Sequence, residues 1–149
     1  MKIGKRKPFD NILIAVDDKQ KDYISFFMPS DDYWIYDTGE IERKDGKDFL
    51  KTRETNKGYL ITDIQDDNHK THTVYVHRIV AYVFLKKTPE RNEVHHAGDK
   101  KDNRPSQLVW ASPEEHAILD KLKNTNKQEH RKLFNAIKKD NRERGKYGE

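Results

Sequence analysis

The 149-residue sequence contains no cysteine. This absence excludes a disulfide scaffold, a thiol nucleophile and every zinc site that needs a thiolate ligand. No run of about 18 apolar residues occurs, so the sequence predicts no transmembrane helix and no membrane partner. The basic N-terminus leads into an apolar stretch that is interrupted by Asp10 and Asn11 and stops at Asp17, with no signal-peptide cleavage motif after it. We therefore expect a cytoplasmic protein.

Apolar residues are scarce and charged residues are abundant. Hydrophobic residues make up 33% of the chain and charged residues 38%, against about 45–50% and about 25% in typical globular domains. A thin core with long polar stretches is expected. The net charge of +4 is unevenly spread, because residues 1–9 carry +4 and residues 121–149 carry +6. Two basic ends that flank an acidic middle are typical of arms that bind a polyanion. Solvated tails with no partner are an equally good interpretation.

Hydrophobic periodicity predicts short strands first and helices later, which is an α+β arrangement in one compact unit. The strand-like segments, separated by turn signals, are residues 11–16, 23–28, 33–36, 40–43, 48–52, 59–65 and 71–76. Residues 78–85 change to a helical period, with Ile79, Val80, Val83 and Phe84 on one face. Two further short strands, residues 93–97 and 107–110, flank a charged loop.

The C-terminal part carries two helix starts. Ser112, Pro113 and Glu115 form a capping-box pattern, which predicts a helix to about residue 123. Thr125 is the expected N-cap of a second, very basic helix over residues 126–140, which we expect to fray after Arg142. The chain then divides into a basic arm with short strands (1–32), a β-rich region with one helix (33–92), a compact centre (93–123) and a basic helical tail (124–149).

Most chemistry-bearing residues lie in the compact centre. A strand ends in His95 and His96, and His116 occupies the fourth position of the capped helix. A hairpin packed on that helix can bring one of the paired histidines close to His116. Adjacent strand residues point to opposite faces, so the other histidine is free to act as a base on water. A metal ion that stabilises charge, together with a base that activates water, is one way to hydrolyse a phosphodiester.

At these residues the sequence resembles the HNH endonucleases, which have a ββα-metal fold. The matching features are the His95-His96 pair, the loop at 98–104, the strand ending in Trp110, and His116. Upstream, residues 33–39, residues 58–60 and the V-H-R-x-V-A pattern that begins at residue 76 resemble phage and intron homing-type members. The resemblance covers about residues 33–120 and implies a strand-rich region, a ββα-metal core and a basic C-terminal helix.

The resemblance implies metal-dependent hydrolysis of double-stranded DNA. His95 and His116 fall on the metal-ligand positions, His96 on the general base, and Gln107 on the asparagine that braces the loop. Gln107 is one methylene longer than asparagine, so the brace is either weaker or supplied by Asn103. Asp120, one turn after His116, is a candidate third ligand.

One divalent ion is the implied cofactor, with magnesium or manganese favoured and zinc or nickel as alternatives. Products with a 5′-phosphate and a 3′-hydroxyl are implied as well. The basic residues expected to contact the DNA backbone are Arg78, Lys100, Lys101 and Arg104, and the basic tail is either a DNA-gripping helix or a disordered end. The target sequence, the number of strands cut and the oligomeric state stay open.

Several residues have simpler interpretations. We expect His77 to orient the helix start or to pack against the site, and Trp110 to lie in the core. Tyr33, Trp34 and Tyr36 suit sheet packing, and no special role is expected for His69, His72 or His130. Two rival functions are an HNH-like module that binds DNA or protein with little catalysis, and a toxin-like nuclease that needs an immunity partner. A phage-encoded chain would act in the host-cell cytoplasm.

Overall fold

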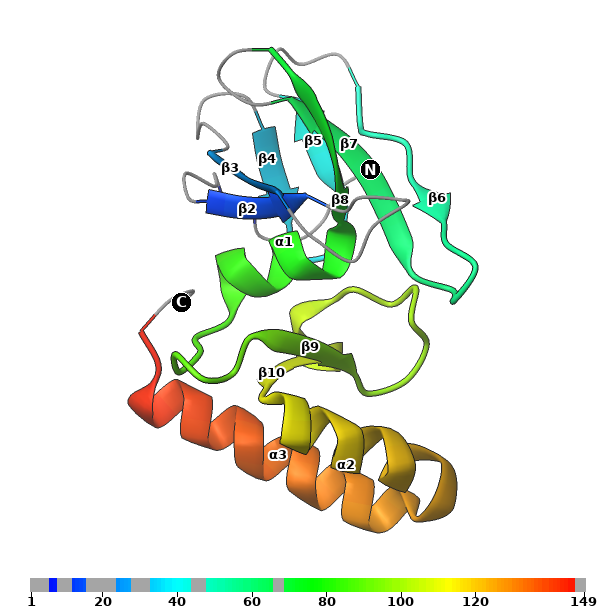
Figure 1. Cartoon of the computed structure of the whole chain (residues 1–149), viewed down its shortest axis with the longest axis vertical. Helices are drawn as coiled ribbons and strands as arrows, with labels where there is room; N and C mark the ends of the chain where they lie inside the picture. The colour runs from blue at the N-terminus through cyan, green and yellow to red at the C-terminus, as the bar shows by residue number, and fades with distance from the viewer. Residues whose placement is uncertain are drawn as a thin grey trace.

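The computed structural model of the chain describes residues 6–7, 12–15, 24–27, 33–43, 48–65 and 69–146. Short strands fill the upper part of Figure 1, α1 crosses below them, and a hairpin with two helices forms the lower part. This α+β order agrees with the prediction. The expected basic arm lies largely outside the described residues, as do the last three residues of the tail.

The upper part contains three small antiparallel sheets, ordered β1-β4-β5, β2-β3 and β6-β7-β8. Their strands are β1 (Arg6–Lys7), β2 (Ile12–Ala15), β3 (Ile24–Phe27), β4 (Tyr33–Tyr36), β5 (Ile41–Arg43), β6 (Arg53–Glu54), β7 (Leu60–Gln65) and β8 (Thr71–Tyr75). Most of the predicted strands are confirmed. Residues 48–52 are a correction, because only Phe49 makes an isolated bridge, to Glu42, and regular pairing resumes at β6.

Helix α1 (Val76–Phe84) begins two residues earlier than predicted, directly after β8. Its apolar face carries Ile79 and Val80, both fully buried, in a core shared with the upper sheets. Trp110 closes this core from below, and its indole donates a hydrogen bond to the carbonyl oxygen of Ala81 at 3.1 Å. Trp110 is 0% exposed, which confirms the expected core position.

The hairpin of β9 (Glu93–His96) and β10 (Leu108–Ala111) lies between two apolar clusters. On one face, Val94, Leu108 and Trp110 join the core under α1. On the other face, Val109 and Ala111 pack against Leu119, Phe134 and Ile137 of the C-terminal helices. Strand alternation therefore puts His96 on the α1 face with Val94, and His95 on the opposite face.

Helices α2 (Pro113–Thr125) and α3 (Lys127–Arg144) cover the lower face of the hairpin (Figure 1). The predicted capping box at Ser112 and Glu115 is confirmed. The predicted cap at Thr125 is wrong, because Asn126 accepts the hydrogen bond from the Glu129 amide, and the Thr125 hydroxyl donates to Lys121 instead. The helix also stays regular through Arg144, past the predicted fraying point.

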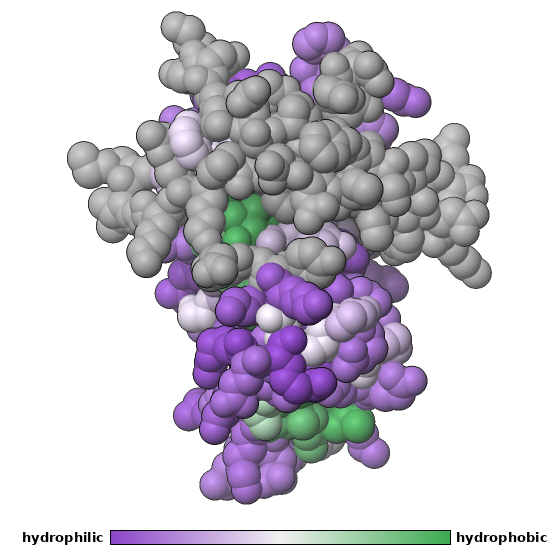
Figure 2. Space-filling view, turned by 90° about the vertical axis from the view of Figure 1, so that its left-hand side faces the viewer, coloured by the Kyte–Doolittle hydropathy of each residue, from purple (hydrophilic) through white to green (hydrophobic). Residues whose placement is uncertain are grey.

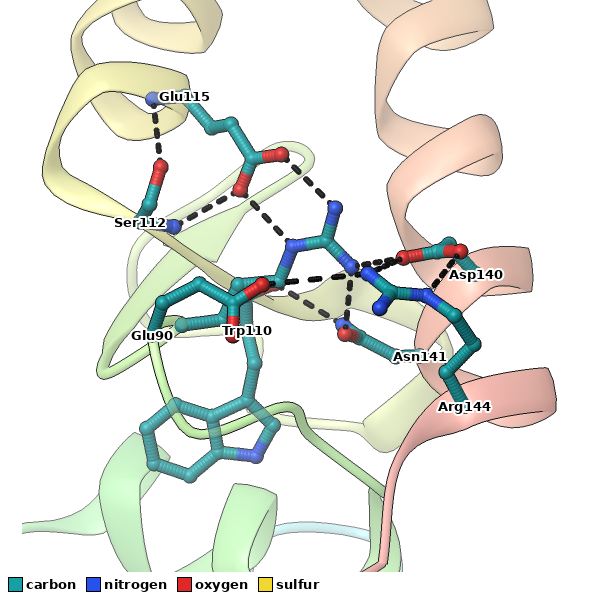
Figure 3. A network of polar contacts seen from close by, with 8 residues as sticks. Glu90, Trp110, Ser112, Glu115, Asp140, Asn141 and Arg144 are labelled. Carbon is teal, nitrogen blue, oxygen red and sulfur yellow. Dashed lines mark hydrogen bonds and ion pairs between the residues drawn. The ribbon is translucent and has the colours of Figure 1, made fainter.

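Helix α3 is tied to the rest of the lower layer by a polar network around Arg91. The Arg91 guanidinium donates to Glu115 of α2 at 2.9 Å and to Asp140 of α3 at 2.6 Å. Asn141 also accepts from Arg91 and donates to the Trp110 carbonyl at 3.0 Å. Figure 3 shows Glu115 and Asp140 facing each other across this network from their two helices. The tail helix is thus packed into the fold.

The visible described surface in Figure 2 is largely hydrophilic, with a small hydrophobic area at the level of the two C-terminal helices. Among the described residues, no helix is long and apolar enough to cross a membrane.

Candidate active site

Three side chains that can ligate a metal meet on the lower face of β9. His95, His116 and Asp120 each offer one ligand atom, and these atoms lie within 4.8 Å of one another. Asp120 Oδ1 is 3.0 Å from His95 Nδ1 and 3.5 Å from His116 Nε2. The positions i and i+4 place His116 and Asp120 on one face of α2, over the end of β9. The structure therefore brings together both predicted histidines and the candidate third ligand.

The tautomer of His116 suits metal binding. Its Nδ1 lies 2.7 Å from Glu93 Oε1, and a carboxylate oxygen accepts hydrogen bonds, so Nδ1 carries the proton. The lone pair is then on Nε2, the atom nearest to Asp120. A histidine whose second nitrogen donates to a carboxylate is the usual arrangement around ligating imidazoles. Two imidazoles and one carboxylate fit a divalent ion, and this donor set accommodates magnesium, manganese, zinc or nickel.

His95 is deeply buried beside these groups, at 2% exposure. Burial, with smaller contributions from His116, His130 and Lys123, lowers the pKa of His95 to about 3. Its imidazole is therefore neutral near pH 7, as metal ligation requires. Its Nε2 lies 2.9 Å from Nε2 of His130, a residue of α3.

His96 lies on the opposite face of the strand, and Asn103 of the loop holds it. His96 Nε2 is 2.8 Å from Asn103 Oδ1, so Nε2 donates to the carboxamide oxygen and Nδ1 keeps the lone pair. Burial lowers the pKa of His96, and the Asn103 hydrogen bond acts in the opposite direction. Asn103 is itself 3% exposed, and its Cβ lies 3.2 Å from the position that a Cβ on Gly39 would take. Only glycine suits this turn, because Gly39 also has a φ of +92°.

Aromatic rings surround His96 on the α1 side. The ring of His77 packs edge-on against it at 4.9 Å between centroids, and Tyr59 lies at 5.7 Å. His77 packs against the site, as predicted. Burial holds the pKa of His77 well below its usual value, and its Nδ1 has no hydrogen-bond partner within the described part of the chain. Burial also raises the pKa of Tyr59, with a further contribution from Asp120. These rings keep His96 in one orientation.

A pocket of about 380 Å³ opens between the two halves of the site. Its lining includes Tyr59, His77, Glu93 and His116. It therefore touches both the aromatic rings around His96 and the hydrogen-bonded pair of Glu93 and His116.

The Gln107 side chain lies outside this arrangement. Its backbone ties the hairpin, since its carbonyl accepts from the Ala97 amide at 2.8 Å. No hydrogen bond of its carboxamide is found among the described residues, and its oxygen lies near Gly98. Lys123 of α2 instead fixes the start of the loop by donating to the Gly98 carbonyl at 2.5 Å. Of the two residues weighed as the brace, Asn103 is the one in contact with His96.

The four basic residues expected to contact DNA differ in their surroundings. Lys100 extends over the ring of Tyr59, with Nζ 4.8 Å from the centroid. Lys101 pairs with Glu54 at 2.9 Å, and Arg104 pairs with Asp102 at 2.6 Å. The guanidinium of Arg78 lies over Trp110, 5.7 Å from the ring centroid. Lys100 is thus the one of the four that adjoins a ring in contact with His96.

Two residues that the sequence did not single out contact the histidines through polar atoms. The sequence predicts no special role for His130, yet it is 7% exposed and its ring contacts His95. Glu93 was seen only as the start of a strand. A signal existed for His130, because it lies four residues before Phe134 and seven before Ile137, on the same helical face. For Glu93 no local pattern distinguishes it from other acidic residues.

Comparison with known proteins shows that the chain is similar to HNH endonucleases. No protein-family model matches the chain. Over 97 residues it is 35% identical to an uncharacterized HNH endonuclease of Acanthamoeba polyphaga mimivirus, a match that covers 62% of this chain and 29% of that protein. Its fold is similar to the HNH homing endonuclease I-HmuI, from a structure describing DNA binding and cleavage, with a TM-score of 0.55 and 26% identity. That match covers 62% of this chain and 52% of the other.

The β9–β10 hairpin packed on α2 is a ββα arrangement, and the chain is similar in sequence and in fold to HNH endonucleases. The chain spans less than a third of the length of its viral relative and about half of the structural neighbour.

Proposed function

We propose that the protein is a metal-dependent endonuclease that hydrolyses phosphodiester bonds of double-stranded DNA. One observation carries this proposal. Three candidate metal ligands, His95, His116 and Asp120, lie beside His96, and Asn103 binds Nε2 of His96 and leaves Nδ1 available as a base. Similarity to HNH endonucleases supports the choice of DNA as substrate.

In the proposed reaction, His96 Nδ1 accepts the proton of the attacking water. The Asn103 carboxamide keeps the opposite nitrogen protonated, so Nδ1 is the basic atom throughout. The buried ring of His77 and the half-buried ring of Tyr59 prevent the imidazole from rotating away. General bases of this kind contribute on the order of 10²–10⁴ in rate.

His95, His116 and Asp120 would hold one divalent ion. When bound, such an ion stabilises the negative charge on the phosphate and on the leaving 3′-oxygen. Glu93 keeps the Nε2 lone pair of His116 directed at this position. Magnesium or manganese suits a set that leaves room for water and phosphate oxygens, with zinc and nickel as alternatives. The proposed products carry a 5′-phosphate and a 3′-hydroxyl.

The DNA backbone would lie along the loop at 98–104, where Lys100 flanks the site. A basic hollow of about 620 Å³ lies between the loop and the C-terminal helices. Its lining includes Lys123, Lys127 and Arg131. Both surfaces suit phosphate groups, which position a protein on DNA without specifying sequence. Arg78, Lys101 and Arg104 are proposed as weaker contacts. Lys101 and Arg104 each pair with a carboxylate and Arg78 lies over Trp110, whereas Lys100, among the described residues, contacts only neutral groups, the Tyr59 ring and the Lys57 carbonyl.

The test is cleavage of supercoiled plasmid with magnesium, manganese or EDTA. The proteins compared are the wild type, His96→Ala, His116→Ala and the control His69→Ala, which alters an exposed histidine. We expect metal-dependent cutting by the wild type and the control, and a loss of at least about 10²-fold in His96→Ala. Folded, DNA-binding wild type that cuts with none of these ions would overturn the proposal and leave a binding module.

A further inference from the structure

His95 lies between two hydrogen-bonding groups, one at each ring nitrogen. Its Nδ1 is 3.0 Å from Asp120 Oδ1, and its Nε2 is 2.9 Å from His130 Nε2. The contact between the two imidazoles is a hydrogen bond, so the positions of the protons on the two rings are linked.

Without a metal ion, the carboxylate determines these positions. A lone pair on His95 Nδ1 would face the Asp120 carboxylate at 3.0 Å and be repelled by it, so His95 Nδ1 carries its proton on the side of Asp120. The neutral His95 then has its lone pair on Nε2. Two lone pairs cannot face each other at 2.9 Å, so His130 Nε2 donates to His95.

An ion at the candidate site would require the opposite placement of the proton on His95. His95 Nδ1 must then present its lone pair, and the proton of the neutral ring belongs on Nε2. That proton points at His130 Nε2, which has to become an acceptor. We propose that His130 is a positioning residue whose imidazole exchanges tautomer in step with His95, donating to it in the free protein and accepting from it in the metal-bound protein.

The proton count balances in this exchange. The His95 Nδ1 proton passes to water, and the Nε2 proton of His130 moves to His95 Nε2. His130 takes up one proton from water at Nδ1. Each ring carries one proton before and after, so both histidines remain neutral. Burial lowers the pKa of both rings, which disfavours a doubly protonated intermediate form.

The surroundings of His130 fit this role. The ring is buried beside Phe134, with 6.1 Å between centroids, and helix α3 is held against the hairpin by Lys138, which donates to the Leu108 carbonyl at 2.7 Å. An apolar residue in place of His130 would leave His95 Nε2 without a partner in both states. A buried unpaired nitrogen is costly, so the ring would turn out of alignment.

The inference rests on the proposed metal-dependent function, but its main test does not need catalysis. Nitrogen-15 NMR of the full chain reports the tautomers of His95 and His130 with and without Mg²⁺. We expect both rings to change tautomer together on Mg²⁺ saturation, with His95 protonated at Nδ1 before and at Nε2 after. A His130 ring that keeps its tautomer at saturation would overturn the inference.

Two variants provide a second readout, the affinity for Mn²⁺ measured by electron paramagnetic resonance. His130→Phe retains a ring beside Phe134 but can neither donate nor accept, whereas His130→Gln can do both. We expect His130→Phe to weaken Mn²⁺ binding by roughly 10–100-fold, with His130→Gln restoring most of it, and circular dichroism confirming that both are folded. Equal Mn²⁺ affinities in the two folded variants would contradict the inference.

Plasmid cleavage by the wild type separates the proposed nuclease function from the proposed role of His130. Metal-dependent cleavage without the joint tautomer change would reject only the role of His130. A joint tautomer change without any cleavage would reject the nuclease function and retain that role.

Discussion

Glu93 accepts a hydrogen bond from His116 Nδ1 at 2.7 Å, across the gap between the first residue of β9 and the first turns of α2. This contact fixes which nitrogen of His116 is available to an ion. Glu93→Ala should therefore weaken Mg²⁺ or Mn²⁺ binding by roughly 10–100-fold, as measured by calorimetry. Glu93→Gln keeps an acceptor and should lose much less. Unchanged affinity in Glu93→Ala would show that Glu93 does not orient His116.

Asn103 allows catalysis and metal binding to be tested separately, because it contacts His96, the proposed base, and none of the proposed metal ligands. Asn103→Ala should lower the cleavage rate by up to about 10²-fold, since a misplaced base loses its alignment with water. Its Mn²⁺ affinity should stay at the wild-type level. Asn103→Asp retains an oxygen that accepts from His96 Nε2 and should keep more of the rate. A parallel loss of metal affinity in Asn103→Ala would instead indicate a general disruption of the loop.

The basic loop predicts unequal effects on DNA binding. Lys100→Ala should reduce affinity and lower the slope of log affinity against log salt by about one, because one phosphate contact is lost. Arg104→Ala should change the slope less, since Asp102 pairs with Arg104 in the free protein. Fluorescence anisotropy with a DNA duplex at several salt concentrations measures both slopes. Identical slopes for the two variants would refute the difference between them.

The Arg91 network predicts a specific dependence of stability on pH. Hydrogen bonds from Arg144 and Arg91 hold the pKa of Asp140 far below its usual value. For Glu115, burial acts upward, but Arg91 and the Ser112 backbone together bring the pKa below its usual value. A carboxyl with a lowered folded pKa stabilises the protein above its unfolded pKa, and this contribution is lost as pH falls through the folded pKa. The free energy of unfolding should thus fall steadily below about pH 4.

Arg91→Met tests the network directly. We expect a loss of about 1–3 kcal/mol near neutral pH, because Glu115 and Asn141 lose a charged partner. The fall in stability with acid should also be shallower than in the wild type. Urea unfolding followed by circular dichroism between pH 3 and pH 7 measures both effects. Arg91→Lys retains the charge without the paired geometry and should give an intermediate loss. Parallel pH profiles for wild type and Arg91→Met would exclude this role.

Much of the fold could be predicted because local signals were strong. The capping box from Ser112 to Glu115 and the helical spacing from Ile79 to Phe84 both depend on near neighbours in sequence. The expectation that His95 and His96 face opposite sides needed only strand geometry. The strand predicted at residues 48–52 is wrong because a short apolar pair, Phe49 and Leu50, between polar residues also suits an irregular segment that makes one bridge.

The contacts of the site with distant elements could not be predicted in the same way. His130 reaches His95 across 35 positions, and Arg91 reaches Asn141 across 50. Such pairs depend on how α3 packs against the hairpin, and packing across a core leaves little trace in local spacing. Asn103 was weighed as an alternative to Gln107, but the choice required knowing which carboxamide points at His96.

Because both faces of the hairpin are buried, the candidate site can form only at a late stage of synthesis. His130 completes the surroundings of His95, and the Arg91 network joins Glu115 to residues near the end of α3. During synthesis, the lower face of β9 and β10 therefore stays only partly covered, by α2, until α3 has left the ribosome. A growing chain that already contains every residue of the hairpin and α2 would still lack an ordered metal-binding group. The proposed cleavage activity would then arise only after α3 has docked.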